Sequence, residues 1–197
     1  MEVLDRELKP WLTLSPEQVD KLHHHYRLLE RWNERINLTS IKPGVEMVLR
    51  HYCESLFLGV HLPSGNGTRI ADIGSGAGFP GVPLAILRPE MQITLVESVR
   101  RKAVFLREAT RELRNVTVLP VRAEAVRENF DWIVSRAVQS IEVLKNVPRL
   151  APKVGLLMGE ASLHVVESPL GIAWSEAVRL PWGDRRLCML GAFHVEH

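Results

Sequence analysis

The spacing of apolar residues predicts a helical N-terminal region. From Ser15 onward, apolar residues recur every three or four positions, which places them on one face of a helix. Ser15 can cap this helix, Pro16 suits its first position, and Gln18 can complete a capping box. A second helix is predicted from Pro43. The apolar stripes of the two helices are Val19, Leu22, Tyr26, Leu29, Trp32 and Ile36, then Val45, Val48, Leu49, Tyr52 and Leu56.

The pattern changes after the turn-rich segment 63–67. Beyond it, short apolar runs rich in β-branched residues alternate with stretches long enough for crossover helices, which predicts a doubly wound, mostly parallel sheet. The last two runs, joined by a Pro-Trp-Gly-Asp turn, predict a terminal antiparallel hairpin. We therefore expect helices over 1–62 and a Rossmann-like domain over 63–197, packed as one compact unit. The seven predicted strands are Arg69–Ile73, Gln92–Glu97, Val116–Val121, Trp132–Ser135, Gly155–Met158, Ala173–Leu180 and Arg186–Phe193.

Composition fits one soluble globular domain. The chain has 197 residues, of which 46% are hydrophobic and 24% charged. Its net charge of +2 excludes a polybasic nucleic-acid coat but not a local basic patch. Cys53 and Cys188 lie too far apart for a CxxC site, which favours a reducing compartment. With no apolar leader and no stretch long enough to span a bilayer, we expect a cytoplasmic protein.

A glycine-rich loop follows the first predicted strand. Asp72 precedes glycines at 74, 76, 78 and 81, in the pattern D-x-G-x-G-x-G. Glycines at such a turn let the backbone approach a ligand closely, although a plain strand–helix turn is the simpler interpretation. The loop lacks the lysine with which a P-loop meets a terminal phosphate. An adenosine-type ligand without a polyphosphate fits better, and S-adenosylmethionine is the obvious candidate.

Three further segments follow neighbouring strands of the predicted sheet. Glu97 closes the second strand, where a carboxylate can accept the two hydroxyls of a ribose. Ala123 and Glu124 follow the third strand, where a loop could flank an adenine. Arg136 closes the fourth strand and could hold the carboxylate of the cofactor or a nucleic-acid phosphate, or simply pair with a surface acid.

A row of arginines is predicted on the helix after the second strand. Arg100, Arg107, Arg111 and Arg114 are spaced so that a continuous helix would present them in one narrow stripe. Such a stripe can follow a phosphate backbone, or it can be an ordinary solvated helix face.

Metal binding and covalent catalysis find little support. The consecutive histidines at 23–25 point in different directions on a helix, and the single pair of His51 and Glu54 is poor grounds for a metal site. The sequence also lacks a Gly-x-Ser-x-Gly elbow, and neither cysteine has an obvious histidine partner.

Several segments together resemble the bacterial 16S ribosomal RNA methyltransferase G family, also called glucose-inhibited division protein B. The likeness runs in order through nearly the whole chain. The segment containing N-L-T and the F-P-G extension of the glycine loop are its most specific parts. The matching segments are Trp32–Ile41, His51–Leu56, Asp72–Leu84, Arg101–Leu106, Ser135–Ala137 and Arg185–Leu187.

The resemblance implies a helical cap on a class I S-adenosylmethionine-dependent methyltransferase sheet, and methyl transfer to N7 of one guanine in 16S rRNA. It further implies that the positions matching the family's cofactor contacts bind S-adenosylmethionine. Two departures stand out: Met158 where the family usually has lysine, and Glu54 where it usually has aspartate. The predicted cofactor-binding residues are Asp72, Gly74, Gly76, Gly78, Phe79, Glu97, Ala123, Glu124 and Arg136.

Guanine N7 carries a lone pair and no proton, so the reaction requires positioning rather than a catalytic base. Asn37, His51 and Arg136 are the candidates to line the RNA side of the site. The near-neutral charge suggests that an assembled 30S subunit or an assembly intermediate presents the base to a monomeric enzyme. The alternatives are a methyltransferase acting on a small molecule or a protein, and a module that binds S-adenosylmethionine without turnover.

Overall fold

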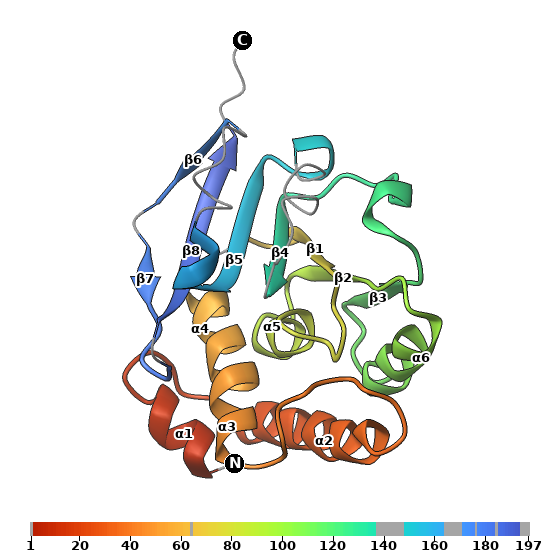
Figure 1. Cartoon of the computed structure of the whole chain (residues 1–197), viewed down its shortest axis with the longest axis vertical. Coiled ribbons are helices and arrows are strands. Elements are labelled where there is room, and N and C mark those ends of the chain that lie inside the picture. Colours follow the sequence, from red (N-terminus) through yellow and green to blue (C-terminus); the bar gives the residue numbers. More distant parts are fainter. Residues whose placement is uncertain are drawn as a thin grey trace.

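A computed structural model describes residues 2–63, 65–136, 148–163, 171–175, 177–183 and 185–193. Within these ranges, eight strands form one sheet in the order β3-β2-β1-β4-β5-β8-β6, and β7 also pairs with β8 (Figure 1). The first five strands run parallel and β8 runs antiparallel to β5. The strands are β1 (Arg69–Ile73), β2 (Gln92–Val96), β3 (Val116–Leu119), β4 (Trp132–Arg136), β5 (Lys153–Gly159), β6 (Ile172–Trp174), β7 (Val178–Arg179) and β8 (Arg186–Phe193).

The doubly wound sheet with a terminal antiparallel hairpin is confirmed, with one difference in its last part. The predicted strand 173–180 is divided into β6 and β7, which gives eight strands rather than seven. The backbone ladder is interrupted at Ser175, whose hydroxyl accepts the Leu190 N–H at 3.3 Å in place of a backbone carbonyl. A side chain that competes for a ladder hydrogen bond in this way shortens a strand.

Helices precede the sheet and connect its parallel strands. They are α1 (Glu2–Leu8), α2 (Pro16–Asn33), α3 (Val45–Met47), the π-helix η1 (Val48–Cys53), α4 (Glu54–His61), α5 (Gly81–Leu87) and α6 (Arg100–Ala109), with short 3-10 turns η2 (Ala123–Ala125) and η3 (Glu160–Ser162). The capping box of α2 is confirmed: Ser15 Oγ accepts the Gln18 N–H, and Gln18 Oε1 accepts the Ser15 N–H. Because α2 ends at Asn33, Ile36 packs on the core from the turn beyond it.

The second predicted helix differs from a regular α-helix. It begins at Val45 rather than Pro43, and Val45 is 54% exposed instead of buried. A π-helical segment then widens the helix before α4. Residues 51–59 are all buried in succession, which happens when a helix runs through the interior with neighbours on every side. This interior helix carries both His51 and Glu54.

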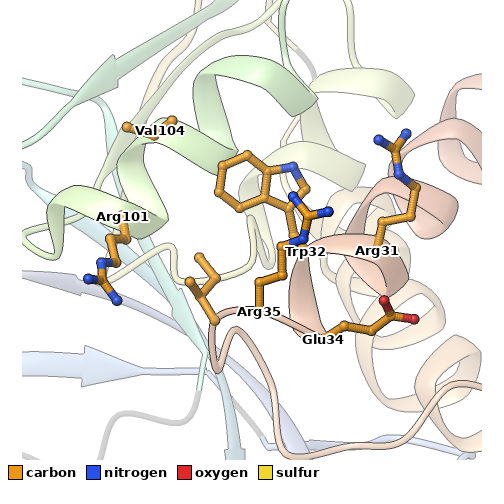
Figure 2. A pocket seen from close by; sticks show the side chains of 7 residues that line it. Arg31, Trp32, Glu34, Arg35, Arg101 and Val104 are labelled. Atoms are coloured by element: carbon orange, nitrogen blue, oxygen red, sulfur yellow. The ribbon is translucent and has the colours of Figure 1, made fainter.

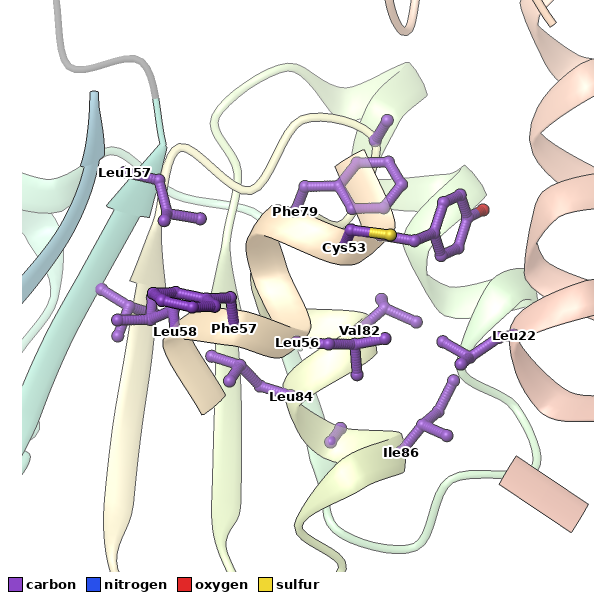
Figure 3. Close-up of a cluster of buried hydrophobic side chains, with 14 of the residues drawn as sticks. Leu22, Cys53, Leu56, Phe57, Leu58, Phe79, Val82, Leu84, Ile86 and Leu157 are labelled. Carbon is purple, nitrogen blue, oxygen red and sulfur yellow. The ribbon is translucent and has the colours of Figure 1, made fainter. Parts of the chain in front are cut away.

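The helical region and the sheet share one hydrophobic core. Leu22 of α2, Leu56 of α4 and Leu84 of α5 pack together beside the sheet, which contributes Leu157 from β5 (Figure 3). A second cluster, which includes Ile133, covers the other face of the sheet. The sequence boundary at residue 62 therefore does not separate two cores. In the described ranges no helix combines the length and apolarity needed to cross a membrane.

The predicted arginine stripe is wrong. Helix α6 ends at Ala109, where the Thr110 hydroxyl donates to the Leu106 carbonyl at 2.7 Å. The chain then turns towards β3, because the Asn115 side chain is held by carbonyls of the α5–β2 region. Arg111 and Arg114 consequently lie outside the helix, and four arginines in one row do not form.

Candidate functional site

The sheet order brings the predicted cofactor segments together. Strands β3, β2, β1 and β4 are neighbours and parallel, so the segments that follow them meet at one edge of the sheet. These segments carry η2, Glu97, the glycine loop and Arg136. In open α/β sheets this carboxyl edge is where ligands bind. We call it the carboxyl edge below.

The glycine loop is tied to β2 and open above Gly74. The N–H groups of Gly74 and Ser75 both donate to the Val96 carbonyl, at 2.9 and 3.1 Å. Gly74 has a φ of +74°, is exposed, and would have nothing within 4 Å of an added Cβ. Gly76 and Gly78 also have positive φ values. The loop therefore needs glycine for its conformation, and at Gly74 it leaves space that a ligand can enter.

Asp72 supports this loop from below. Its carboxylate is fully buried, and Oδ2 accepts the Gly81 N–H at 3.0 Å. Burial raises the pKa of Asp72 to about 7, against the lowering effect of the hydrogen bond from Gly81. An added Cβ at Gly81 would meet Leu95 and Asp72 itself. The carboxylate of Asp72 thus fixes the start of α5, and its predicted role in binding the cofactor stays a prediction.

Glu97 joins the loop to the next strand. Its Oε2 accepts the Gly76 N–H at 2.9 Å and its Oε1 accepts the Val99 N–H at 2.7 Å. Each carboxylate oxygen has two acceptor positions, so both can still accept a hydroxyl proton. These two backbone bonds hold the carboxylate in one orientation beside the glycine loop.

The segment after β3 borders the same edge. The Glu97 N–H donates to the Leu119 carbonyl at 3.1 Å, which fixes β3 against the end of β2. Ala123 is half-buried and Glu124 is exposed in the short turn η2. Arg149 holds this turn by donating to the carbonyls of Ala123 and Val126. Both predicted residues thus follow the strand that neighbours β2, at the same edge of the sheet as Glu97.

Phe79 and His51 form an aromatic cluster beneath the loop. Their rings stack at 4.5 Å with an interplanar angle of 17°, and both residues are buried. The Tyr52 hydroxyl donates to Nδ1 of His25 at 2.8 Å, and Nε2 of His25 donates to the Ala77 carbonyl of the loop at 3.1 Å. The interior helix and α2 therefore hold the loop from below. The side chain of Phe79 packs in this cluster, and its contact with the cofactor stays a prediction.

His51 does not line an open surface as predicted. Its side chain is 2% exposed, and burial, reinforced by neighbouring arginines, lowers its pKa to about 2. Nε2 lies 2.8 Å from the Thr39 hydroxyl, whereas Nδ1 has no hydrogen-bond partner among the described residues. The neutral ring connects the N-L-T segment to the aromatic cluster.

The N-L-T segment is shaped by Asn33 at the end of α2. The side-chain oxygen of Asn33 accepts the N–H groups of Leu38 and Thr39, and its amide donates to the Thr39 carbonyl. This arrangement leaves Asn37 exposed in the turn. Of the three residues predicted for the RNA side, Asn37 is exposed, Arg136 is half-buried and His51 is buried.

A buried ion cluster, which the sequence did not reveal, surrounds Glu54. Glu54 is fully buried and receives two hydrogen bonds from Arg186, at 3.1 and 2.7 Å. Nε of Arg50 lies 3.2 Å and Nε of Arg136 lies 3.8 Å from its oxygens. Burial lowers the pKa of Arg136 to about 10, while Glu54 opposes this effect. We call these four residues the Glu54 cluster.

The Glu54 cluster gives Arg136 a defined place at the carboxyl edge. The Ser135 hydroxyl donates to the Ile73 carbonyl, so β4 is fixed directly beside the strand that leads into the glycine loop. Nε of Arg136 is buried and makes no hydrogen bond to the residues that the structure describes. The signal in the sequence was the i, i+4 spacing of Arg50 and Glu54, but only the fold brings Arg186 to the same carboxylate.

The remaining predicted features lie apart from this edge. His23 and His24 are exposed on α2 while His25 is buried, so the three side chains diverge. Burial lowers the pKa of His25 to about 4. Met158 is buried in the hydrophobic cluster on the other face of the sheet, so no cation stands at that position. Arg185 is exposed, with a φ of +60°.

Comparisons with known proteins agree with this geometry. A family model described as rRNA small subunit methyltransferase G matches residues 18–158. The protein named ribosomal RNA small subunit methyltransferase G from Cronobacter sakazakii is 35% identical over 194 residues, or 92% of each chain. The protein of the same name from Roseiflexus castenholzii is 43% identical over 153 residues, which cover 73% of this chain and 65% of that protein. The matched region thus spans somewhat less than two-thirds of the Roseiflexus relative.

Solved structures support the fold class. A fibrillarin pre-rRNA processing protein from Methanococcus jannaschii superposes with a TM-score of 0.61 at 13% identity, covering 83% of this chain and 86% of that one. Fibrillarin from Aeropyrum pernix, solved with S-adenosylmethionine bound, superposes with a TM-score of 0.56 at 20% identity, covering 71% and 73%. The predicted class I methyltransferase fold is confirmed.

Proposed function

The chain belongs to the rRNA small subunit methyltransferase G family, and on that premise we propose that it transfers a methyl group from S-adenosylmethionine to N7 of a guanine in 16S rRNA. The observation that carries this proposal is the open backbone at Gly74 between two oriented charges, the carboxylate of Glu97 and the guanidinium of Arg136. An adenosine ligand with a charged amino-acid tail needs these three features.

The residues of the carboxyl edge fit this cofactor. Gly74 provides close approach, and Glu97 keeps acceptor positions for the ribose hydroxyls. Arg136 is half-buried at the end of β4, and its Nε faces Glu54, so the guanidinium is held at the carboxyl edge, where it would meet the carboxylate of the methionine part. Ala123 and Glu124 border the place next to Glu97, where the adenine would lie. Phe79 contributes indirectly, through the aromatic cluster that supports the loop.

The chemistry requires positioning rather than proton transfer. S-adenosylmethionine supplies a methyl group on a positively charged sulfur, and guanine N7 brings a lone pair and no proton. The protein needs no general base, which agrees with a neutral, buried His51. Holding two reactants in line can contribute about 7–11 kcal/mol to the lowering of the barrier. Glu97 and Arg136 would fix one reactant, and exposed groups such as Asn37 would contact the RNA.

The substrate would be presented by a ribosomal particle. With a net charge of +2, the protein has little general attraction for naked RNA. We therefore propose that it acts on the 30S subunit or an assembly intermediate, and we also propose that it does so as a monomer in the cytoplasm.

The test is methyl transfer to small ribosomal subunits from a strain that lacks the modification. The protein is incubated with these particles and labelled S-adenosylmethionine, and the rRNA is digested to nucleosides for mass spectrometry. We expect one labelled 7-methylguanosine per particle. Particles from the modifying strain serve as the matched control and should take up no label.

Other outcomes would contradict the proposal. Label in a metabolite or a protein, with none in rRNA, would indicate a different methyltransferase. Cofactor binding in calorimetry without turnover on any of these substrates would indicate a sensor. Label at a guanine atom other than N7 would confirm rRNA as the substrate but show that N7 is not the atom methylated.

A further inference from the structure

A basic hollow lies between the end of α2 and the start of α6. Its volume is about 420 Å³. Arg31, Trp32 and Arg35 line it from α2 and the turn that follows, and Arg101 and Val104 line it from α6 (Figure 2). Glu34 and Ile36 complete the lining. We call it the Trp32 hollow.

The charge of the Trp32 hollow is positive. Three guanidinium groups and one carboxylate line it. In the described part of the chain, none of Arg31, Arg35 and Arg101 lies within 4.0 Å of a carboxylate oxygen. A neighbouring hollow differs, because the acids Glu17, Asp20, Glu108 and Glu112 line it along with its basic residues. The Trp32 hollow therefore has more unpaired positive charge than this neighbour, although the two share Arg31.

The inner surface of the hollow is aromatic and rigid. The indole of Trp32 packs edge-on against Phe105, with ring centroids 5.8 Å apart and an interplanar angle of 64°. Phe105 is fully buried, so the indole rests on the core. Val104, beside it, leaves 45% of its surface exposed to solvent. A flat π-surface among guanidinium groups is the combination with which proteins bind single-stranded nucleic acid.

The hollow adjoins the start of the helix that follows β2. Arg101 lies in the first turn of α6, four residues after Glu97. Because β2 leads directly into α6, a ligand in the hollow would lie beside the place proposed for the cofactor. Arg31 and Arg35 come from α2, whose His25 contacts the glycine loop.

We propose that the Trp32 hollow binds a single-stranded segment of the substrate RNA next to the target guanine. Arg35 and Arg101 contact its phosphates from opposite sides, and the indole of Trp32 stacks on one base. This inference rests on the proposed function, since it names the surface that holds the rRNA. It also replaces the arginine stripe as the basic surface of the enzyme.

The experiment compares two double variants that each remove two positive charges. R35A/R101A changes the hollow, and R107A/R114A, the matched control, changes exposed arginines outside it. For each, the KM for unmodified 30S particles, kcat, and the Kd for S-adenosylhomocysteine are measured. Binding of an RNA of about 20 nucleotides is followed by fluorescence anisotropy from about 50 to 200 mM salt.

We expect R35A/R101A to raise the KM for particles and the Kd for RNA roughly tenfold, with little change in the Kd for S-adenosylhomocysteine. The slope of log K against log salt should become shallower by about 1.4, the value for two phosphate contacts to a single strand. R107A/R114A should stay within about twofold of the wild type. W32L should weaken RNA binding while W32F retains it, and thermal melting checks that both fold.

Three results would overturn the inference. Equal effects of the two double variants would show that only overall charge matters. A raised KM for particles with unchanged RNA binding would indicate a ribosomal protein as the occupant. If the wild type methylates rRNA and R35A/R101A leaves all values unchanged, the Trp32 hollow does not bind RNA, and the proposed function still holds. If the wild type methylates no rRNA, the proposed function itself is wrong.

Discussion

The glycine loop and the Glu54 cluster serve the same edge of the sheet but are built differently. The two carboxylates that bind the loop are close to it in sequence: Asp72 accepts from Gly81, nine residues away, and Glu97 accepts from Gly76, 21 residues away, while His25 supports the loop from a greater distance along the chain. In the Glu54 cluster, the two partners Glu54 and Arg186 are 132 residues apart. The loop uses backbone N–H groups and conformations available to glycine, whereas the cluster uses side-chain charges removed from water. A local motif can be recognised from sequence, but a charge cluster of this kind depends on the whole fold.

The largest effect is expected from E54Q. The substitution removes the carboxylate that three arginines share, and a buried ion pair broken on one side costs about 3–5 kcal/mol of stability. Urea unfolding measures the loss. E54D, which keeps the charge, is the control and should lose clearly less. A stability loss below about 1 kcal/mol for E54Q would mean that water solvates the arginine charges once the carboxylate is gone, as it does for ion pairs at a surface.

Gly81 and Gly74 separate the structural part of the loop from its binding part. In G81A the new Cβ meets Leu95 and Asp72, so we expect a loss of about 1–3 kcal/mol of stability. In G74V the new side chain enters open space, so the fold should lose about 1–2 kcal/mol from its positive φ while cofactor binding disappears. Urea unfolding and calorimetry with S-adenosylhomocysteine measure the two effects. Unchanged cofactor affinity in G74V would remove this glycine from the binding site.

The buried carboxyl of Asp72 makes the stability of the protein depend on pH. Its pKa is about 7 in the folded protein and near 3.8 when unfolded, so between these values the folded state holds the extra proton. Its contribution to stability is therefore complete below about pH 4 and is lost as the pH rises through about 7. D72N should remove this loss, so that its stability relative to the wild type increases from pH 5 to pH 7.

The quantity to follow is the difference in the free energy of unfolding between D72N and the wild type at each pH. His25 acts in the opposite direction, because its pKa is lowered to about 4 and its contribution grows as the pH rises towards 6.5. Both proteins contain His25, so its effect cancels in the difference. A difference curve that is flat over this range would show that the Asp72 carboxyl titrates normally.

The smallest effect is expected from T39V, in the segment that joins the two regions. The substitution keeps the shape of the side chain but removes its hydrogen bonds with His51 and with the Ile41 N–H. A stability loss of about 1–2 kcal/mol is expected, because two hydrogen bonds are removed and a typical one contributes about 1 kcal/mol. T39S retains the hydroxyl and should recover most of the loss. Equal losses in the two variants would attribute the effect to packing.

The sequence predicted the parallel sheet well because each strand is an apolar run bounded by turn residues. It predicted β1 (Arg69–Ile73) and β8 (Arg186–Phe193) to the residue, and the capping box of α2. It failed where a tertiary contact decided the outcome. The side chain of Asn115 is held near α5, so α6 ends before Arg111, and the π-helical turn changes which residues around His51 are buried.

By itself, the sequence determined the order of the elements, the glycine loop and the acids and arginine that follow neighbouring strands, because these depend on periodicity and on local backbone conformation. Only the tertiary structure decided that Asp72 and Phe79 support the loop from below, that His51 is buried, and that Arg186 joins Arg136 at Glu54. Burial and charge pairing depend on which distant residues meet, and the packing of the N-terminal helices against the sheet settles that.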